Sequence, residues 1–172
     1  MKVNIALLTV TDTRTLEDDK SGSILVNKIS EANHSLVDRK ICKDNKKDIK
    51  KNLNMWLKKK NIDVIITTGG TGLTGRDITP EALNEIADKQ IPGFGEMFRY
   101  VSLETVGTSS IQSRACAILA NGKYVFALPG SSGGVTDAWD KILIHQLDIN
   151  HKPCNFVELF TRLKEKMFKI LI

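Results

Sequence analysis

The sequence predicts an α/β fold, a three-layer sandwich in which helices cover both faces of a mostly parallel β-sheet. Short apolar runs at residues 3–10, 64–66 and 124–128 are typical of buried strands, and a polar or Gly-rich loop follows each of them. Stretches with apolar residues at helical spacing alternate with these runs. Such alternation indicates parallel strands that are connected through helices.

The first half of the chain alternates strand and helix. After the strand at 3–10, Ser21 is expected to cap a helix that continues to Ala32. The alternating apolar and polar residues 36–41 then suit a strand near the edge of the sheet. Asp44 is placed to cap the next helix, which carries apolar residues on one face and lysines on the other.

The second half of the chain is expected to add one antiparallel strand. Residues 114–119 and 124–128 flank Asn121–Gly122, which predicts a hairpin. The other expected elements are a helix opening at Pro80, a loop at 91–96, a helix restarting at Met97, a helix over 135–147 and a last helix within 155–172. The large apolar residues of that last helix suit packing on the core or, alternatively, a subunit contact. Residues 1–172 are expected to form a single domain.

The amino-acid composition limits the kinds of molecule that the protein is expected to bind. The net charge is +5, from 25 basic and 20 acidic residues. Clustered lysines suit a solvated helix face, and attraction of polyanionic small molecules or of nucleic acid is the alternative. No aromatic residues interleave with the lysines, so we expect no nucleic-acid partner. The three cysteines are widely spaced, and no signal-peptide pattern or membrane-length apolar run occurs, so a cytoplasmic protein without membrane contact is expected.

The stretch DVIITTGGTGLTGRDITPEAL, residues 63–83, places a Gly-rich loop between a strand and a helix. Glycine lets the backbone approach a phosphate closely, and turned N–H groups supply hydrogen-bond donors. The hydroxyls of Thr68, Thr71 and Thr74 add to these donors. On its own such a loop is more often just a turn.

The position of several loops strengthens the prediction of a ligand site. Loops beginning at Thr11, Asp44, Thr68 and Pro129 all follow predicted strands. In open α/β sheets, ligands bind beyond the carboxyl ends of the strands. These four loops are therefore expected to converge on one cleft.

Several motifs together resemble the MoaB/MogA family of molybdopterin-binding proteins of molybdenum cofactor biosynthesis. The motifs are LTVTDT, D-x-S-G at 19–22, TTGGTG with RDITPEA, P-G-F-G-E at 92–96, Ser113–Arg114, LPGS at 128–131 and PCNF at 153–156. The last of these looks more like MoaB than MogA. The resemblance implies a three-layer α/β fold, assembly as a homotrimer or homohexamer, and molybdopterin as ligand.

The resemblance also implies an activity: Mg-ATP-dependent adenylylation of molybdopterin to adenylyl-molybdopterin, with release of pyrophosphate. A phosphate nucleophile needs positioning and charge neutralisation more than a general base. Asp77 and Asp44 are the residues implied to hold Mg²⁺ or to orient the reactants. The residues implied to bind the ligands are Asp12, Ser21, Gly69, Gly70, Thr71, Gly72, Thr74, Arg76, Glu81, Ser113, Arg114, Pro129, Gly130 and Ser131.

These assignments have alternatives. The structural alternatives are a helix cap for Asp44 and for Asp77, a solvent contact for Arg76, a favourable first-turn charge for Glu81 and hairpin hydrogen bonds for Ser113–Arg114. At the level of function, PGSSGG at Pro129 departs from the PGNP-like turn of catalytic relatives. A non-catalytic molybdopterin-binding or accessory protein is therefore one alternative, and a scaffold or regulatory module of the same fold is another.

Overall fold

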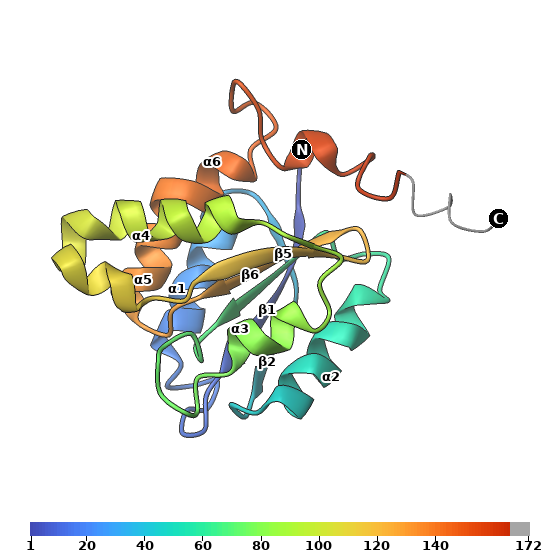
Figure 1. The fold of residues 1–172 in the computed structure, drawn as a ribbon. Helices are drawn as coiled ribbons and strands as arrows, with labels where there is room; N and C mark the ends of the chain where they lie inside the picture. The colour runs from blue at the N-terminus through green and yellow to red at the C-terminus, as the bar shows by residue number, and fades with distance from the viewer. Residues whose placement is uncertain (166–172) are drawn as a thin grey trace.

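The computed structural model describes residues 1–165 and contains a six-stranded sheet as its middle layer (Figure 1). The strands are β1 (Asn4–Val10), β2 (Ser35–Cys42), β3 (Val64–Thr68), β4 (Lys89–Gln90), β5 (Cys116–Ala120) and β6 (Lys123–Leu128), in the spatial order β2-β1-β3-β6-β5-β4. β1 pairs in parallel with β2 and β3, and β3 pairs in parallel with β6. β5 runs antiparallel to both of its neighbours. The prediction of a mostly parallel sheet with one antiparallel member is confirmed.

Helices connect the strands and cover both faces of the sheet. They are α1 (Lys20–Glu31), α2 (Lys46–Leu57), α3 (Thr79–Asn84), α4 (Pro92–Val106), α5 (Ser132–Ala138) and α6 (Ile144–Gln146), with a 3-10 helix at Gly107–Gln112 and a π-helical turn at Trp139–Leu143 that joins α5 to α6. In the part of the chain that the structure describes, none of these helices combines the length and apolar character that crossing a membrane requires.

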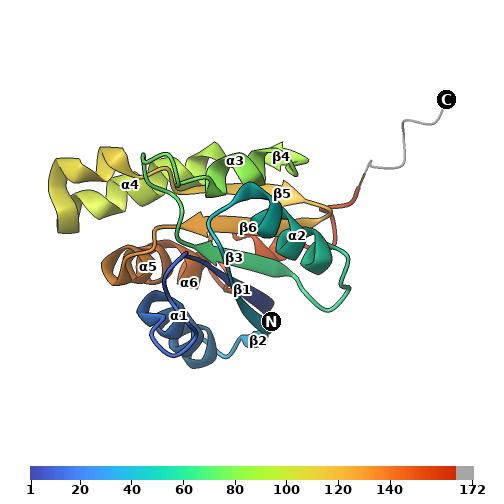
Figure 2. The same cartoon turned by 90° about the horizontal axis from the view of Figure 1, so that it is seen from below.

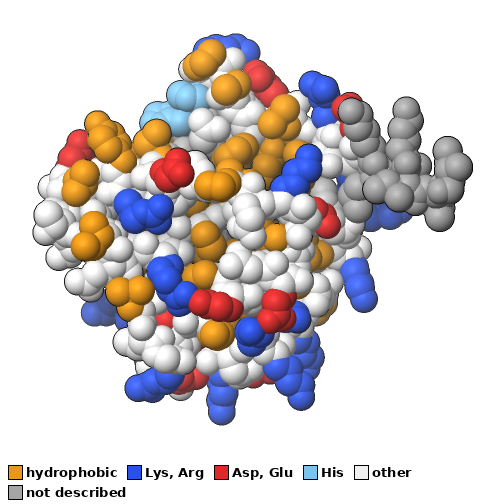
Figure 3. Space-filling model, in the orientation of Figure 1, with side chains coloured by type: hydrophobic (Ala, Val, Ile, Leu, Met, Phe, Trp, Pro, Cys, Tyr) orange, Lys and Arg blue, Asp and Glu red, His pale blue; other side chains and the backbone are white. Residues whose placement is uncertain are grey.

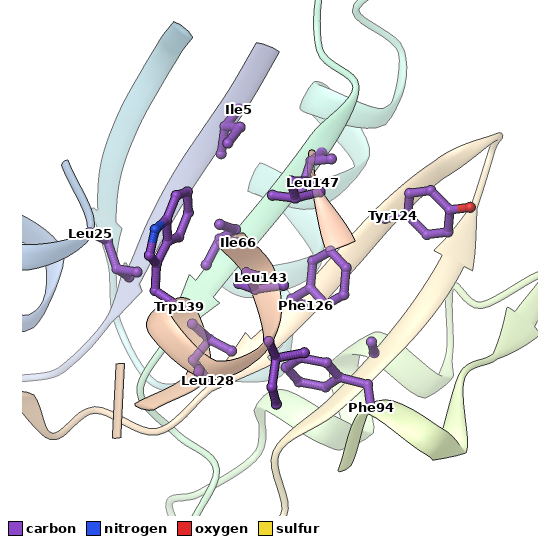
Figure 4. Packing of buried hydrophobic residues seen from close by; sticks show 14 of the residues in the cluster. Ile5, Leu25, Ile66, Phe94, Tyr124, Phe126, Leu128, Trp139, Leu143 and Leu147 are labelled. Carbon is purple, nitrogen blue, oxygen red and sulfur yellow. The ribbon is translucent and has the colours of Figure 1, made fainter. Parts of the chain in front are cut away.

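Two apolar cores lie on opposite faces of the sheet. The larger core packs α1, α4 and α5 against the sheet, with Leu25, Phe126 and Trp139 fully or almost fully buried (Figure 4). Figure 1 and Figure 2 both show α1, α5 and α6 grouped on one side of the strands. The second core packs α2 and α3 on the other face, around Leu53 and Trp56. Two cores around one sheet confirm the three-layer architecture.

Helix α4 begins five residues earlier than predicted. The glycines at 93 and 95 suggested a loop, but Pro92 sits at the start of the helix, where its fixed φ is favourable and no N–H is needed. Gly95 has a packing role, because a Cβ at this position would lie 2.5 Å from the carbonyl oxygen of Ala115. The glycine therefore allows α4 to pack closely against the chain that leads into β5.

The predicted last helix within 155–172 is wrong for the residues that the structure describes. Only a 3-10 helix at Val157–Leu159 forms, and turns follow it to residue 165. Phe156 and Phe160 pack individually on Tyr124, with ring centroids 4.6 and 5.8 Å away, and this local packing replaces a continuous helical stripe. The remainder of the predicted helix, 166–172, lies outside the described residues.

Two predicted helix caps are also wrong. Asp19, not Ser21, caps α1, and its carboxylate accepts a hydrogen bond from the backbone N–H of Gly22 at 2.9 Å. Asn45, not Asp44, caps α2 by accepting from the N–H of Asp48 at 2.9 Å. Ser21 and Asp44 each lie one or two residues from the true cap, so both are available for other contacts.

Candidate functional site

A cavity of about 680 Å³ lies at the carboxyl ends of β1, β3 and β6. The loops after these strands form most of its wall, and the loop between β2 and α2 contributes Asp44. Figure 1 shows the loops after β1 and β3 at the same edge of the sheet, beside the start of α5. The structure therefore brings together the loops at Thr11, Asp44, Thr68 and Pro129 that were expected to converge.

The Gly-rich loop takes a conformation that requires glycine. Gly69 and Gly70 have φ values of 101° and 65°, which side-chain-bearing residues rarely adopt. A Cβ on Gly69 would lie 2.2 Å from the carbonyl oxygen of Val10. The Thr79 hydroxyl donates to the Gly69 carbonyl at 2.9 Å, and the Thr79 N–H donates to the Gly70 carbonyl at 3.0 Å. The start of α3 therefore fixes this loop against the end of β1.

Arg114 holds the same loop from outside the cavity. Its Nε donates to the Gly72 carbonyl at 2.7 Å, and its Nη2 donates to the Asp77 carbonyl at 2.6 Å. Its Nη1 pairs with the Glu81 carboxylate, and its backbone N–H donates to the Thr71 carbonyl at 3.0 Å. Burial would raise the pKa of Glu81, but the hydrogen bond and charge of Arg114 hold it below its usual value. Arg114 and Glu81 thus shape the site without lining it.

Asp77 lines the cavity and is fixed by a local turn. One of its carboxylate oxygens accepts from the N–H of Thr74 at 2.8 Å and from its hydroxyl at 2.6 Å. Burial opposes ionisation, but these hydrogen bonds, followed by one from the Gly72 backbone and the charge of Arg114, lower the pKa of Asp77. Asp77 makes no cap bond to α3, so the helix-cap alternative for this residue is wrong.

Asp44 is held close to a second carboxylate. Its backbone N–H donates to the Asp12 carboxylate at 3.1 Å. Within residues 1–165, its buried Oδ1 has no hydrogen-bond partner. Burial, and then the negative charges of Asp77 and Asp12, raise the pKa of Asp44. Three carboxylates therefore border one cavity, and one of them has a buried oxygen that lacks a donor.

The donor set suits a hard cation that also binds a ligand. In the described residues, no group of three or more His, Cys, Asp or Glu side chains is arranged to hold a metal ion by itself. Mg²⁺ commonly takes one or two protein carboxylates and completes its coordination with water and substrate phosphates. The partnerless oxygen of Asp44 fits such a role.

The end of β1 contributes a buried hydrogen-bond network next to the cavity. The Asp19 carboxylate accepts from the Thr9 hydroxyl at 2.6 Å, from the Ser21 hydroxyl at 3.2 Å and from Arg39 Nη2 at 3.0 Å. Burial opposes ionisation of Asp19, but these partners and Gly22 lower its pKa. Ser21 lines the cavity with its hydroxyl oriented by Asp19.

The loop after β6 closes another side of the cavity. The Ser131 hydroxyl caps α5 by accepting from the Gly134 N–H at 3.1 Å. The Thr68 hydroxyl donates to the Pro129 carbonyl at 2.7 Å, which ties this loop to the end of β3. Arg14 Nη1 approaches the Gly130 carbonyl at 3.4 Å across the cavity mouth.

A second hollow of about 740 Å³ borders the cavity at Ser113, Pro129 and Ser131. Its other walls come from α4, the 3-10 helix that follows it, and α5. Both hollows fall within the usual size range of small-molecule binding sites.

Most of the predicted site residues line the first cavity. They are Asp12, Ser21, Asp44, Gly69, Gly70, Thr71, Gly72, Arg76, Asp77, Ser113, Pro129, Gly130 and Ser131. Thr74, Glu81 and Arg114 do not line it, and they act on its walls through the contacts described above. The prediction did not include Thr9, Thr13, Arg14 and Gln112, which also line it. Of these residues, Thr9 could have been found from the sequence, because it is a polar residue within the apolar run of β1.

Residues 6–149 match a family model described as "Probable molybdopterin binding domain". The molybdenum cofactor biosynthesis protein B of Escherichia coli is 45% identical over 152 residues, covering 88% of this chain and 89% of that protein. The chain belongs to the MoaB family of molybdenum cofactor biosynthesis proteins. The MoaB family member from Bacillus cereus is 43% identical over 147 residues, covering 85% of this chain and 87% of that protein.

Solved structures agree with this family. A crystal structure of molybdenum cofactor biosynthesis protein B superimposes with a TM-score of 0.86 at 39% identity, covering 95% of this chain and 96% of that one. The tungsten cofactor synthesizing protein MoaB from Pyrococcus furiosus superimposes with a TM-score of 0.74 at 35% identity, covering 83% of this chain and 91% of that one. The predicted family and fold class are both confirmed.

Proposed function

We propose that this MoaB family member catalyses Mg-ATP-dependent transfer of an adenylyl group to molybdopterin, with release of pyrophosphate. The observation that supports this best is the buried, partnerless Oδ1 of Asp44 beside the carboxylates of Asp12 and Asp77. Three carboxylates on its wall would weaken the binding of an anionic ligand unless a cation accompanied that ligand, since carboxylates repel phosphate. Carboxylates beside a Gly-rich phosphate loop are expected where a cation accompanies the phosphate.

The chemistry requires little beyond positioning. A terminal phosphate oxygen of molybdopterin attacks the α-phosphorus of ATP, and the bond from that phosphorus to the oxygen bridging to the β-phosphate breaks. The electron pair leaves with pyrophosphate, so no side chain has to accept a proton. The backbone of Gly69–Gly72 and the cations Arg14 and Arg76 line the cavity and would hold the negatively charged groups in place.

Asp44 and Asp77 are the residues that would hold Mg²⁺. The pKa values of the two carboxylates are shifted in opposite directions: hydrogen bonds from Thr74 lower that of Asp77 against the effect of burial, whereas burial and the neighbouring carboxylates raise that of Asp44. When bound, Mg²⁺ supplies neutralisation of the phosphate charge. Asp12 fixes the backbone of Asp44 through its 3.1 Å contact and so holds that carboxyl in position.

Pyrophosphate release tests this proposal. Purified protein with molybdopterin and Mg-ATP is expected to release pyrophosphate, and Asp44→Asn is expected to lower the rate at least about a hundredfold, because an amide does not replace a metal-binding carboxylate. Asp140→Asn, an equal change at an exposed aspartate paired with Lys28, is the control. Equal rates in Asp44→Asn and the control would contradict the proposed role of Asp44.

A non-catalytic molybdopterin-binding or accessory protein is the alternative function. It is favoured by the contacts of Asp77, whose carboxylate already accepts three hydrogen bonds from its own loop and has a structural task. This alternative predicts that wild-type protein binds molybdopterin without releasing pyrophosphate.

We also propose assembly as a homotrimer or homohexamer, as the family resemblance implies. Exposed apolar side chains gather on α4 and the following 3-10 helix, and the orange patches of Figure 3 mark apolar side chains on this part of the surface. They are Met97, Tyr100, Leu103, Val106 and Ile111, with exposed fractions between 47% and 78%. A face this apolar suits a partner. Light scattering of the purified chain is expected to give three or six times the monomer mass, and a monomer would contradict the proposal.

A further inference from the structure

A third hollow adjoins the candidate site on the side of β2. Its volume is about 690 Å³, and it lies between the loop after β1, the end of β2 and one side of α2. We call it the basic groove, lined by Thr11, Asp12, Arg14, Lys40, Ile41, Cys42, Lys43, Asp48, Lys51, Asn52 and Met55. Thr11, Asp12 and Arg14 also line the first cavity, so the two hollows share a wall.

The groove collects cations that lack anionic partners. Arg14, Lys40, Lys43 and Lys51 line it, and within residues 1–165 none of them forms an ion pair. By contrast, two other lysines of α2, Lys46 and Lys50, both pair with Glu85. Figure 3 shows basic side chains along the lower border of the molecule, where α2 and the loop after β1 lie in Figure 1.

The two carboxylates of the groove, Asp12 and Asp48, offset only part of the charge of its four cations, and within residues 1–165 neither forms an ion pair with them. Asp48 is engaged with Asn45, whose Nδ2 donates to it at 2.8 Å. Asp12 accepts from the backbone of Asp44. The Nζ of Lys40 contacts the sulfur of Met55 at 3.5 Å, which is a weak acceptor. Like charges gathered around one hollow repel each other, and a multiply charged anion would relieve that repulsion.

We propose that the basic groove binds the β- and γ-phosphates of the nucleotide, and then the pyrophosphate that leaves. This inference rests on the proposed adenylyl transfer, because that reaction breaks the bond between the α-phosphorus and the oxygen that bridges it to the β-phosphate. The departing pyrophosphate carries away the electron pair of that bond. Lysines bind phosphate as point charges, and cations placed at a leaving group stabilise the charge that develops there.

The shared wall explains why the two hollows would act together. Asp12 and Arg14 stand where the carboxylate-lined cavity meets the groove. A phosphate chain that begins at the Gly-rich loop and continues past Asp12 leaves the acidic region and enters the basic one. Because the charge of the wall changes along this path, the phosphate chain of the nucleotide is expected to bind in one orientation, with its leaving group in the basic groove.

The first test measures binding of inorganic pyrophosphate by calorimetry, without molybdopterin and without turnover. Lys43→Gln/Lys51→Gln is expected to weaken pyrophosphate binding at least about tenfold, because two charge-assisted contacts are lost. Lys47→Gln/Lys58→Gln removes the same charge from exposed positions of α2 and its C-terminal end outside the groove, and serves as the control. Equal weakening in both variants, or no binding of pyrophosphate by the wild-type protein, would overturn the proposal.

A second measurement separates this inference from the proposed function. AMP lacks the β- and γ-phosphates, so the groove variant is expected to bind AMP as the wild type does, while its KM for ATP rises. If the groove variant turns over with an unchanged KM for ATP, the proposed role of the groove in binding phosphate is contradicted, while the proposed adenylyl transfer still stands. Pyrophosphate binding that is lost in the groove variant, without any turnover by the wild type, would support the groove as an anion site and refute adenylyl transfer.

Discussion

The guanidinium of Arg114 donates to the carbonyl of Gly72 at 2.7 Å, although the two residues are 42 positions apart in the chain. The same guanidinium also contacts the Asp77 carbonyl and the Glu81 carboxylate. One side chain just before β5 thereby fixes the Gly-rich loop, the backbone of Asp77 and the first turn of α3. The shape of the candidate site therefore depends on a residue that does not itself line the cavity.

Arg114→Lys is expected to lower the free energy of unfolding by about 1–3 kcal/mol, because one ammonium cannot replace the three directed contacts of the guanidinium. Ligand binding is expected to weaken as well, since the Gly-rich loop loses its outer support. Urea denaturation and molybdopterin titration measure the two effects. Arg162→Lys, an exposed arginine near the end of the described chain, is the control. Equal stability of the two variants would contradict the role given to Arg114.

Gly69→Ala is expected to destabilise the protein by about 2 kcal/mol or more, because its Cβ would meet backbone at a positive φ. The clash is with the Val10 carbonyl oxygen, at 2.2 Å. Gly75→Ala in the same loop is the matched control, since nothing lies within 4 Å of a Cβ there. Thermal denaturation of both variants should show a large loss only for Gly69→Ala, and similar midpoints would argue against the required close approach.

The contributions of Asp44 and Asp77 to the free energy of unfolding should change with pH in opposite directions. Burial and neighbouring carboxylates raise the pKa of Asp44, so the native state holds that proton more tightly than the unfolded chain. Its contribution to stability is therefore present at low pH and is lost as pH rises through the raised pKa. Asp44→Asn is accordingly expected to increase the free energy of unfolding at pH 7. This gain in unfolding free energy should disappear as the pH falls below the usual pKa range of an aspartate side chain.

The contribution of Asp77 to stability changes with pH in the opposite direction. The hydrogen bonds from Thr74 outweigh burial and lower the pKa of Asp77, so its contribution is present at neutral pH and is lost as pH falls through the lowered pKa. Asp77→Asn should therefore reduce stability at pH 7. Urea denaturation of both variants at several pH values checks the pair of predictions, and changes of the same sign at pH 7 would refute this description of the acidic cluster.

Asp19→Ala is expected to lower the free energy of unfolding by about 2–4 kcal/mol, since it removes a helix cap and leaves Arg39 without its carboxylate partner. Asp19 is 1% exposed and holds Thr9, Ser21 and Arg39 together. Glu17→Ala, an exposed residue in the same loop, should change stability by less than about 0.5 kcal/mol. Chemical denaturation that gave equal losses in both variants would contradict a structural role for this network.

Strands β1, β3 and β6 were predictable because each is an apolar run that ends abruptly in a polar or Gly-rich loop, whereas β4, two exposed polar residues, was not predicted. The same feature located the cavity, since parallel strands place their following loops at one edge of the sheet. Capping residues were harder, because Asp19 and Ser21, or Asp44 and Asn45, are equally capable neighbours. Only the direction in which the chain enters the helix selects between them.

The support of the site could not be predicted from local pattern. The resemblance implies ligand contacts for Arg114 and Glu81, and the structure shows that these two side chains pair with each other. The Asp19 network joins residues from β1, α1 and β2, which the sequence separates by up to 30 positions. Contacts of this kind depend on how the strands are ordered in the sheet, and no spacing in the sequence encodes that order.

The most direct test of the central claim is detection of the product. Wild-type protein is incubated with molybdopterin and Mg-ATP, and the bound and released pterins are analysed by mass spectrometry. We expect molybdopterin carrying one adenylyl group, formed in equal amount to pyrophosphate and absent with Asp44→Asn. Recovery of bound but unmodified molybdopterin from the wild-type protein would contradict adenylyl transfer and favour the binding protein.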